Sequence, residues 1–328
     1  MSLETLDAQA VHRQSIVADG HCDTLGRVFE GQRRLGERSS IGQFDLPRAL
    51  DGGLTLELMA TFTSAVRPGT GCRQTLQFID VFYQELDAYG DLAMLAVCAD
   101  DVRRAKDSGK VALMLSMEGA EGLEGDLRLL RTYYRLGLRC LGITWNRRNE
   151  AADGTEERGT GGGLTQFGRD LVKECIRLGI VLDLSHLAPR GVEDVLELAD
   201  GPVIVTHANS YALWPHPRNL TDSQLEAIAR TGGFVGFCPV AMFLGENKDR
   251  GQLPALLDHV DHMVSVMGED GVGLGMDFDG MEETRVLGIE DVSMLPNLSS
   301  GLSERGYSPA AISKILGGNF MRVLDSVL

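Results

Sequence analysis

The sequence lacks long hydrophobic runs. Its longest apolar runs, such as residues 111–115 and 203–205, end within a few residues, whereas a helix that crosses a bilayer needs about 18. We therefore expect no membrane span. The 328 residues are 43% hydrophobic and 24% charged, and these ordinary globular values argue against a disordered or fibrous chain.

Closely spaced cysteines and an excess of positive charge are also missing. The six cysteines are spread along the chain without C-x-x-C spacing: Cys22, Cys72, Cys98, Cys140, Cys175 and Cys238. A chain of this size does not need disulfides, so we expect reduced thiols in a cytoplasmic protein. Residues 1–10 are acidic where a signal peptide would be basic, so we expect no export signal. The formal net charge of −16 opposes binding to nucleic acid or to an anionic membrane.

The apolar pattern predicts parallel strands joined by helices, because short β-branched runs alternate with segments of helical periodicity. The expected strands are 15–23, 54–63, 111–118, 138–145, 180–186, 203–207, 233–239 and 271–279. The expected helices are 73–89, 126–136, 166–178, 189–198, 223–230, 253–267 and 308–316. Eight strands with both faces buried fit a closed barrel better than an open sheet, although periodicity alone does not separate the two. We predict one α/β domain over residues 1–328, a (β/α)8 TIM-type barrel with its active site at the C-terminal ends of the strands.

Two loops differ from ordinary connections. Residues 146–163 are charged and rich in glycine, and residues 208–222 contain two prolines, two aromatic side chains, His216 and Arg218. Long loops in compact domains usually form lids or binding loops. The pattern leaves open whether His216 faces a pocket.

Side chains that can bind metals occur at the C-terminal ends of five expected strands. They are His21 and Asp23, Glu118, His186, His207 and Asp277. In a β/α barrel these ends form one rim, where active sites are built. Because side chains alternate along a strand, we expect His21 and Asp23 to face one side and Cys22 the other.

This cluster favours a metal site over ordinary packing. A single histidine at a strand end is more often a hydrogen-bonded packing residue than a ligand. Three histidines and two carboxylates at matching strand ends, however, would be costly to bury without a cation. Imidazole and carboxylate ligands without thiolate suit zinc, with manganese, iron and cobalt as alternatives. Five ligands exceed what one catalytic zinc needs, so we predict two Zn²⁺ ions bridged by Glu118.

The order of these residues along the chain resembles that of the membrane (renal) dipeptidase family. Its members are metallopeptidases built on amidohydrolase-type barrels. The resemblance covers nearly the whole chain and rests on these motifs: Asp19-Gly20-His21-Cys22-Asp23, Glu118-Gly119, Leu182-Asp183-Leu184-Ser185-His186, Thr206-His207-Ala208-Asn209-Ser210, Arg218-Asn219-Leu220 and Gly275-Met276-Asp277-Phe278-Asp279-Gly280. It implies a zinc-dependent dipeptidase that tolerates a D-residue at the C-terminal position of its substrate, and a homodimer.

The resemblance also implies a ligand set. One zinc would be held by His21, Asp23 and Glu118. The second would be held by Glu118, His186 and His207.

The family resemblance implies catalytic roles for two further residues. A water that bridges both metals would be acidified and would attack the peptide carbonyl as hydroxide. Asp277 would carry the proton to the leaving amine. Arg218 would bind the terminal carboxylate of the substrate and so restrict its length to a dipeptide.

One departure from the family lies at the end of the fourth expected strand. Where animal members have a histidine in a Leu-Thr-His context, this chain reads Ile143-Thr144-Trp145-Asn146. That histidine helps to hold the substrate carbonyl, whereas tryptophan donates only one N–H and fills more space. We predict that Trp145 and Asn146 contact the substrate, the alternative being a solvated, charged loop.

Other activities remain open from the sequence. Hydrolysis of lactones, esters or cyclic amides would use the same two-metal centre, since fold and centre do not determine the substrate. A binding protein without catalysis is a further alternative. A nucleotide site at residues 271–275 is disfavoured, because the glycines lack the G-x-G-x-x-G spacing and no helix start follows.

Overall fold

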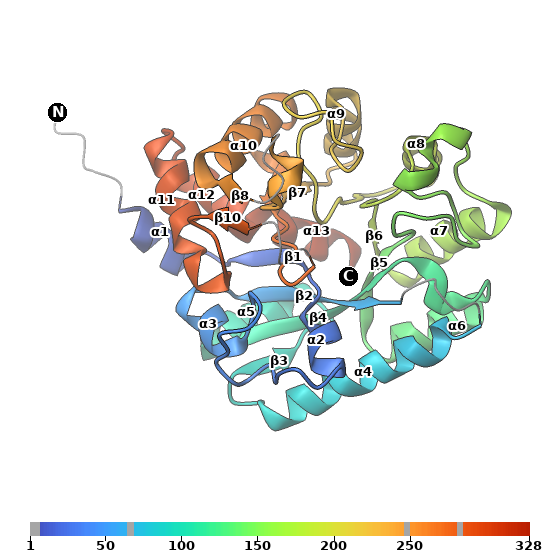
Figure 1. The fold of residues 1–328 in the computed structure, drawn as a ribbon, viewed down its shortest axis with the longest axis horizontal. Helices are drawn as coiled ribbons and strands as arrows, with labels where there is room; N and C mark the ends of the chain where they lie inside the picture. Colours follow the sequence, from blue (N-terminus) through green and yellow to red (C-terminus); the bar gives the residue numbers. More distant parts are fainter. Residues whose placement is uncertain (1–6, 64–68, 246–249, 281–284) are drawn as a thin grey trace.

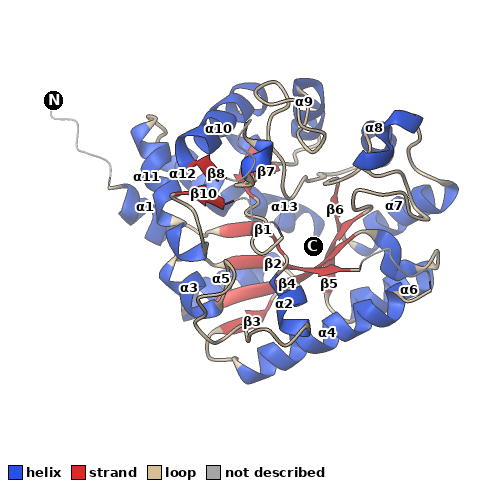
Figure 2. Cartoon of the chain, in the orientation of Figure 1, coloured by secondary structure: helices blue, strands red, loops and turns tan. Residues whose placement is uncertain are grey.

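Helices surround a central group of short strands (Figure 1 and Figure 2). The computed structural model describes residues 7–63, 69–245, 250–280 and 285–328. No helix within these ranges is long and apolar enough to cross a membrane. The six cysteines all fall within these ranges and are free, as expected.

The strands are short. They are β1 (Ala18–Cys22), β2 (Leu56–Phe62), β3 (Ala93–Leu95), β4 (Val111–Glu118), β5 (Leu138–Gly142), β6 (Val181–Asp183), β7 (Val235–Phe237), β8 (Arg250–Gln252), β9 (Val272–Leu274) and β10 (Arg285–Leu287). The α-helices are α1 (Ala8–Gln14), α2 (Thr24–Phe29), α3 (Leu46–Asp51), α4 (Gly71–Ala88), α5 (Ala99–Ser108), α6 (Leu127–Arg135), α7 (Gln166–Leu178), α8 (Pro189–Leu198), α9 (Asp222–Arg230), α10 (Leu253–Met267), α11 (Pro296–Glu304), α12 (Pro309–Ser313) and α13 (Asn319–Val327). Short 3₁₀ segments include η2 (Thr155–Thr160) and η3 (Ala241–Phe243), and η6 (Lys314–Gly318) is a π-helical turn.

The main sheet is parallel. Its strand order is β6-β5-β4-β2-β1-β9-β7, and β3 pairs with the first half of β4. Residues 203–207 form single parallel bridges on both sides, from Ile204 to Asp183 of β6 and from Val205 to Val235 of β7. This segment therefore lies between the two end strands of the order. The expected α/β arrangement of parallel strands and helices is confirmed.

Strand β4 shows why the strands read as continuous apolar runs. All eight of its residues are buried. Ala112 and Met114 pack in one apolar cluster, whereas Leu113 and Leu115 pack in another. Because successive side chains point to opposite faces, a strand covered on both sides has no polar face.

Three glycines let strands approach the segment 203–207 closely. A Cβ at Gly20, Gly236 or Gly275 would come within 2.9, 2.1 or 1.8 Å of the carbonyl oxygen of Thr206. Only glycine fits such close backbone contacts. Gly275, the last glycine of the run 271–275, therefore serves packing between strands.

The expected helix 308–316 is confirmed at α12, but the helical segment continues beyond residue 316. The structure has α12, then the π-turn η6, and then α13. Gly317 lies against the first strand, and a Cβ there would come within 2.4 Å of the carbonyl oxygen of Ile16. This close approach explains the break in the helix. Strands β3, β8 and β10 and helices α1, α2, α3, α5, α11 and α13 had not been expected.

Candidate active site

The C-terminal ends of the parallel strands meet at a cavity of about 730 Å³. Five of the side chains predicted at strand ends line it: Asp23, Glu118, His186, His207 and Asp277. The sixth, His21, is buried directly beside them, with 2% of its surface exposed. The structure thus brings together residues that are up to 256 positions apart, from 21 to 277.

The end of β1 presents two side chains to the cluster. Nε2 of His21 lies 3.3 Å from Oδ2 of Asp23. Cys22 faces elsewhere, and its Sγ lies 3.0 Å from the hydroxyl of Thr24. The alternation along the strand is as expected.

Glu118, the last residue of β4, lies at the centre of the cluster. Its Oε2 is 3.6 Å from Nε2 of His21, and its Oε1 is 3.0 Å from Nε2 of His186. Candidate ligand atoms of His21, Glu118 and His207 lie within 4.8 Å of one another, as do those of His21, Asp23 and Asp277. The two oxygens of one carboxylate therefore face two different imidazoles, which is the arrangement a bridging ligand needs.

Hydrogen bonds at Nδ1 determine the tautomer of His186. Its Nδ1 is 2.7 Å from Oδ1 of Asn146. A carbonyl oxygen can only accept, so Nδ1 must donate. Burial lowers the pKa of His186 to about 4, so the ring is neutral near pH 7 and Nε2 carries a lone pair.

The same reasoning applies to His207. Its Nδ1 is 2.9 Å from Oγ1 of Thr206, and this hydroxyl donates to Oδ2 of Asp183 at 2.7 Å. The hydroxyl hydrogen is thus committed to a carboxylate, and Thr206 accepts the N–H of His207. Nε2 of His207 also carries a lone pair.

These two lone pairs face each other, because the Nε2 atoms of His186 and His207 are only 2.9 Å apart. Burial, followed by the charge of Arg218, lowers the pKa of His186 to about 4. Burial likewise lowers the pKa of His207 well below its usual range. At neutral pH no proton lies between the two nitrogens, and a cation would satisfy both.

The carboxylates of the candidate site would also be stabilised by a cation. Burial raises the pKa of Asp277 well above its usual range, and the charges of Asp23 and Glu118 raise it further. For His21, burial opposes the charged form, but Asp23 and Glu118 outweigh it and raise the pKa. Nε2 of His21 makes no hydrogen bond within the described ranges. Carboxylates and imidazoles crowded in this way fit a metal site.

Unusual backbone conformations mark the same place. Four non-glycine residues in the described part of the chain have positive φ, and three of them are His186 (63°), Asp277 (53°) and Asp279 (67°). Such conformations cost energy and concentrate at functional sites. Gly280 is also constrained, since a Cβ there would come within 2.2 Å of Oδ1 of Asp277.

Arg218 enters the cavity from the loop 208–222. Its side chain is buried, and Nη2 donates to the carbonyl oxygen of His207 at 3.0 Å. Nε is buried without a hydrogen-bond partner among the described residues. His216 lines the same cavity, which answers the question that the sequence left open.

Trp145 and Asn146 both line the cavity. The ring of Trp145 is 6.1 Å from that of His186. The side-chain oxygen of Asn146 is engaged with His186 and with the hydroxyl of Thr155. Asn146 therefore orients a candidate ligand, a role that the sequence did not indicate.

Two further orienting residues were missed from the sequence. Thr206 and Asp183 hold His207 through the hydrogen-bonded chain described above. Both lie at strand ends, but only the contact between neighbouring segments reveals their function. Partners of this kind position metal-binding histidines in many proteins.

A second buried polar cluster supports the loop that carries Asp277. Asp279 accepts hydrogen bonds from the backbone N–H of Gln43 at 2.5 Å and from Thr24, and it pairs with Arg33. We call this cluster, with its neighbouring pairs, the latch: Thr24, Arg33, Gln43, Asp45, Arg48, Asp279 and Asp291.

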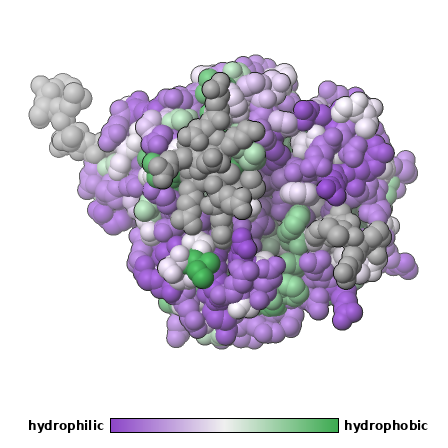
Figure 3. Space-filling view, viewed as in Figure 1, coloured by the Kyte–Doolittle hydropathy of each residue, from purple (hydrophilic) through white to green (hydrophobic). Residues whose placement is uncertain are grey.

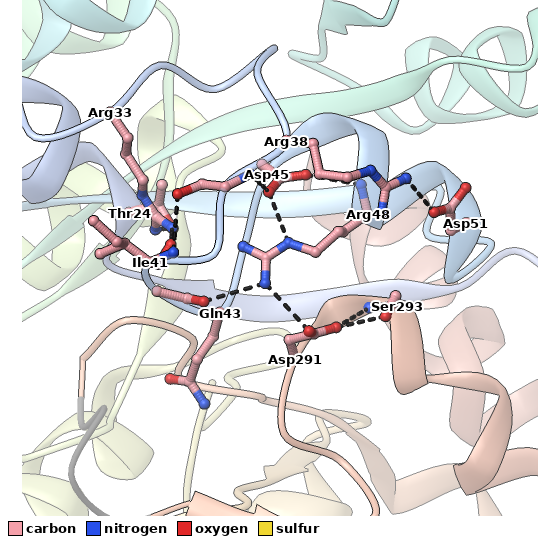
Figure 4. Close-up of polar contacts among 12 residues, drawn as sticks. Thr24, Arg33, Arg38, Ile41, Gln43, Asp45, Arg48, Asp51, Asp291 and Ser293 are labelled. Carbon is pink, nitrogen blue, oxygen red and sulfur yellow. Dashed lines mark hydrogen bonds and ion pairs between the residues drawn. The ribbon is translucent and has the colours of Figure 1, made fainter.

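The rest of the latch is centred on Arg48 (Figure 4). Its Nε donates to Asp45 at 2.7 Å and its Nη1 to Asp291 at 3.2 Å. The latch ties residues 24–48 to the segments that follow β9.

Comparison with known proteins identifies relatives along nearly the whole chain. The family described as membrane dipeptidase, peptidase family M19, matches residues 6–328. Dipeptidase tcpJ of Claviceps purpurea is 36% identical over 326 residues, which cover 94% of this chain and 76% of that protein. Dipeptidase aclJ of Aspergillus oryzae is 32% identical over 297 residues, covering 87% and 70% of the two chains.

Solved structures of metallopeptidases are similar to this chain over nearly its whole length. A metallopeptidase from Rhodobacter sphaeroides, bound to a phosphinate mimic of the dipeptide L-Ala-D-Ala, has a TM-score of 0.89 at 32% identity and covers 96% of this chain and 100% of its own. A dipeptidase described as a metallopeptidase of family M19 has a TM-score of 0.89 at 33% identity and covers 95% and 99%. The resemblance drawn from the motifs is confirmed, and the chain belongs to the membrane dipeptidase family, peptidase family M19.

Proposed function

We propose that this protein is a binuclear zinc dipeptidase that hydrolyses the peptide bond of small dipeptides and tolerates a D-residue at their C-terminal position. The observation that carries the proposal is the pair of Nε2 lone pairs of His186 and His207, 2.9 Å apart beside the carboxylate of Glu118. The R. sphaeroides relative bound to an L-Ala-D-Ala mimic supports the choice of substrate.

The donor set fits two zinc ions. His21, Asp23 and Glu118 would hold one ion, and Glu118, His186 and His207 the other. Imidazole and carboxylate donors without thiolate suit zinc. When bound, the ions would supply Lewis-acid activation of the peptide carbonyl and of water.

Asp277 is proposed to move the proton. Its carboxyl group is buried against Asp23 and Glu118, and its raised pKa favours the protonated form after it has accepted a proton. It can therefore pass that proton to the amine nitrogen, which leaves poorly unless protonated.

Arg218 is proposed to bind the terminal carboxylate of the substrate. One arm of its guanidinium is held by the carbonyl of His207, whereas Nε is buried and lacks a partner within the described ranges. An unpaired buried donor is costly, and a carboxylate supplies the matching acceptors. A further residue at this end would turn that carboxylate into an amide and remove the charge that Arg218 would bind, so the proposed substrate is a dipeptide whose free C-terminus lies at Arg218.

The proposal includes the architecture and assembly around this site. Segment 203–207, bridged to β6 and β7, would close the strand order into an eight-stranded barrel of one domain. We also propose a homodimer, which light scattering would test against the mass of one chain.

Hydrolysis by metal-free and zinc-loaded protein tests the function. The panel contains L-Xaa-L-Xaa and L-Xaa-D-Xaa dipeptides together with lactones, esters and cyclic amides. We expect dipeptide hydrolysis that rises with zinc to about two equivalents, stops with a chelator and returns on adding zinc. Hydrolysis of lactones or esters alone would mean that the site acts on those substrates and not on dipeptides. Zinc binding without any hydrolysis would identify a binding protein.

A further inference from the structure

The cavity has two chemically different sides. One side carries Arg218 and His216, together with Phe243, whose ring lies 4.6 Å from that of His216. The other side carries four aromatic rings among polar side chains such as Glu30 and Gln74. We call these rings the aromatic wall, and they belong to Phe29, Phe62, Phe78 and Trp145.

The aromatic wall consists of two ring pairs, one of which lies beside a candidate ligand. The ring of Trp145 lies 6.1 Å from that of His186 and 5.4 Å from that of Phe62, which it meets at its edge. Phe29 and Phe78 form a second pair with ring centroids 4.9 Å apart. The four rings come from α2, β2, α4 and the segment after β5, so separate elements converge on one apolar surface.

Part of this surface is open. Phe29 is 38% exposed, and Phe62 and Trp145 are half-buried. In the space-filling view, most of the face is hydrophilic, and apolar surface shows in the central hollow (Figure 3). Large exposed aromatic side chains inside a cavity favour a ligand that removes them from water.

The strand order places Phe62 of the aromatic wall opposite the segment to which Arg218 is tied. Phe62 is the last residue of β2, whereas Arg218 is tied to the end of segment 203–207 through the carbonyl of His207. Three strands separate β2 from this segment in either direction along the order. A dipeptide whose carboxylate lies at Arg218 therefore has to extend past Glu118 and His186 toward the aromatic rings.

We propose that the aromatic wall selects dipeptides whose N-terminal residue has an aromatic or large aliphatic side chain. The inference rests on the proposed function, because the orientation of the substrate follows from the carboxylate at Arg218. The N-terminal side chain packs against Phe62 and Trp145 and reaches Phe29 at the mouth. A methyl group in that position leaves most of the aromatic surface in water.

The test compares L-Phe-D-Ala, L-Ala-D-Phe and L-Ala-D-Ala as substrates of the zinc-loaded protein. We expect kcat/KM for L-Phe-D-Ala to exceed that for L-Ala-D-Ala by roughly ten- to a hundredfold, because the ring buries apolar surface. Phe62→Ala and Phe29→Ala should each reduce this preference by about three- to tenfold. Activity on L-Ala-D-Ala should change much less.

Two matched controls accompany these variants. Leu76→Ala removes an apolar side chain of α4 that is 41% exposed and lies outside the cavity, so it should leave the preference unchanged. Phe243→Ala, on the opposite side, should change the rate with L-Ala-D-Phe and not the preference at the N-terminal residue. Calorimetric affinities of the phosphinate analogues of L-Phe-D-Ala and L-Ala-D-Ala give a second readout without turnover.

The outcomes separate the two proposals. Dipeptide hydrolysis with no preference for L-Phe-D-Ala, or with a preference that survives both Phe62→Ala and Phe29→Ala, would overturn the aromatic wall as a selector and leave the dipeptidase intact. A loss of preference in Leu76→Ala equal to that in Phe29→Ala would do the same. Failure to hydrolyse any dipeptide would refute the proposed function and this inference with it.

Discussion

Two buried polar clusters, the latch and the candidate active site, meet in the sequence at residues 23–24 and 277–279, and they differ in how their charges are matched. In the latch, each carboxylate faces a guanidinium or N–H donors: Asp45 with Arg48, Asp291 with Arg48, and Asp279 with Arg33 and Gln43. In the candidate active site, carboxylates crowd one another and two imidazoles face each other with lone pairs. A matched cluster holds structure, whereas a mismatched one is completed by something that the chain does not supply.

The largest effect is expected at the centre of the mismatched cluster. Glu118→Gln removes the charge that both ions would share, so we expect fewer than two zinc equivalents and a kcat lower by about a thousandfold or more. The metal-free variant should be less stable at neutral pH than the metal-free wild type, because His21 and His186 outweigh burial and lower the pKa of Glu118, so its carboxylate contributes to stability. Elemental analysis, kinetics and urea unfolding check the three parts. A variant with two zincs and normal turnover contradicts the bridging role.

Asp277→Asn should separate proton transfer from metal binding. We expect zinc content to stay at two equivalents and KM to stay within a few-fold, while kcat falls by about a hundred- to ten-thousandfold. Steady-state kinetics of zinc-loaded protein measures the split. Near-normal kcat would remove Asp277 from the reaction.

A substitution in the latch should reduce stability more than it reduces catalysis. Asp279→Asn leaves the buried guanidinium of Arg33 without its carboxylate, so we expect a loss of about 3 kcal/mol in the free energy of unfolding. Zinc content should be retained, and kcat should fall modestly because Asp277 lies two residues away. Urea unfolding of the metal-free protein measures the loss.

The control for Asp279→Asn is Asp51→Asn. Asp51 pairs with Arg38 near the latch (Figure 4), but more than half of each of these side chains is exposed. Exposed pairs contribute little, so this variant should be indistinguishable from wild type. Equal losses of stability in Asp279→Asn and Asp51→Asn would mean that a buried ion pair of the latch contributes no more than an exposed pair.

The smallest effect is expected at Glu174, a carboxylate matched by two arginines whose own side chains are exposed. Hydrogen bonds from Arg177, and next from Arg131, lower the pKa of Glu174 to about 2. Its contribution to stability is present above the unfolded pKa near 4.5 and is lost as the pH falls toward 2. Glu174→Gln should therefore flatten the decline of Tm between pH 5.5 and 3.5, by roughly 2 °C or less. An unchanged slope in the metal-free variant would exclude this contribution.

The candidate site was more predictable from the sequence than the structure that supports it. His21, Glu118 and His207 could be grouped because parallel strands carry their C-terminal ends to one edge. The tautomers of the histidines could not be predicted, since they depend on Asn146 in a loop and on Thr206 in a neighbouring segment.

The fold, too, could be predicted only where the local sequence pattern is strong. The bounds of β4, α7, α8 and α10 agree with the expected ranges because long periodic runs carry strong local information. The latch was not foreseen, because its contacts join residues 24–48 to residues 279 and 291 across the chain. Nothing local in either segment specifies its partner. The positive φ of Asp279 likewise has no local cause in the sequence.

Hydrogen bonds fix both ring protons at the candidate metal site, and this affects how ions bind. One series runs from His207 through Thr206 to Asp183, and the other joins His186 to Asn146. Both rings already hold their single proton on the side away from the cavity. Capture of a cation by these two nitrogens thus displaces solvent alone and releases no acid, so buffer choice near neutrality should not alter the heat of loading at these rings.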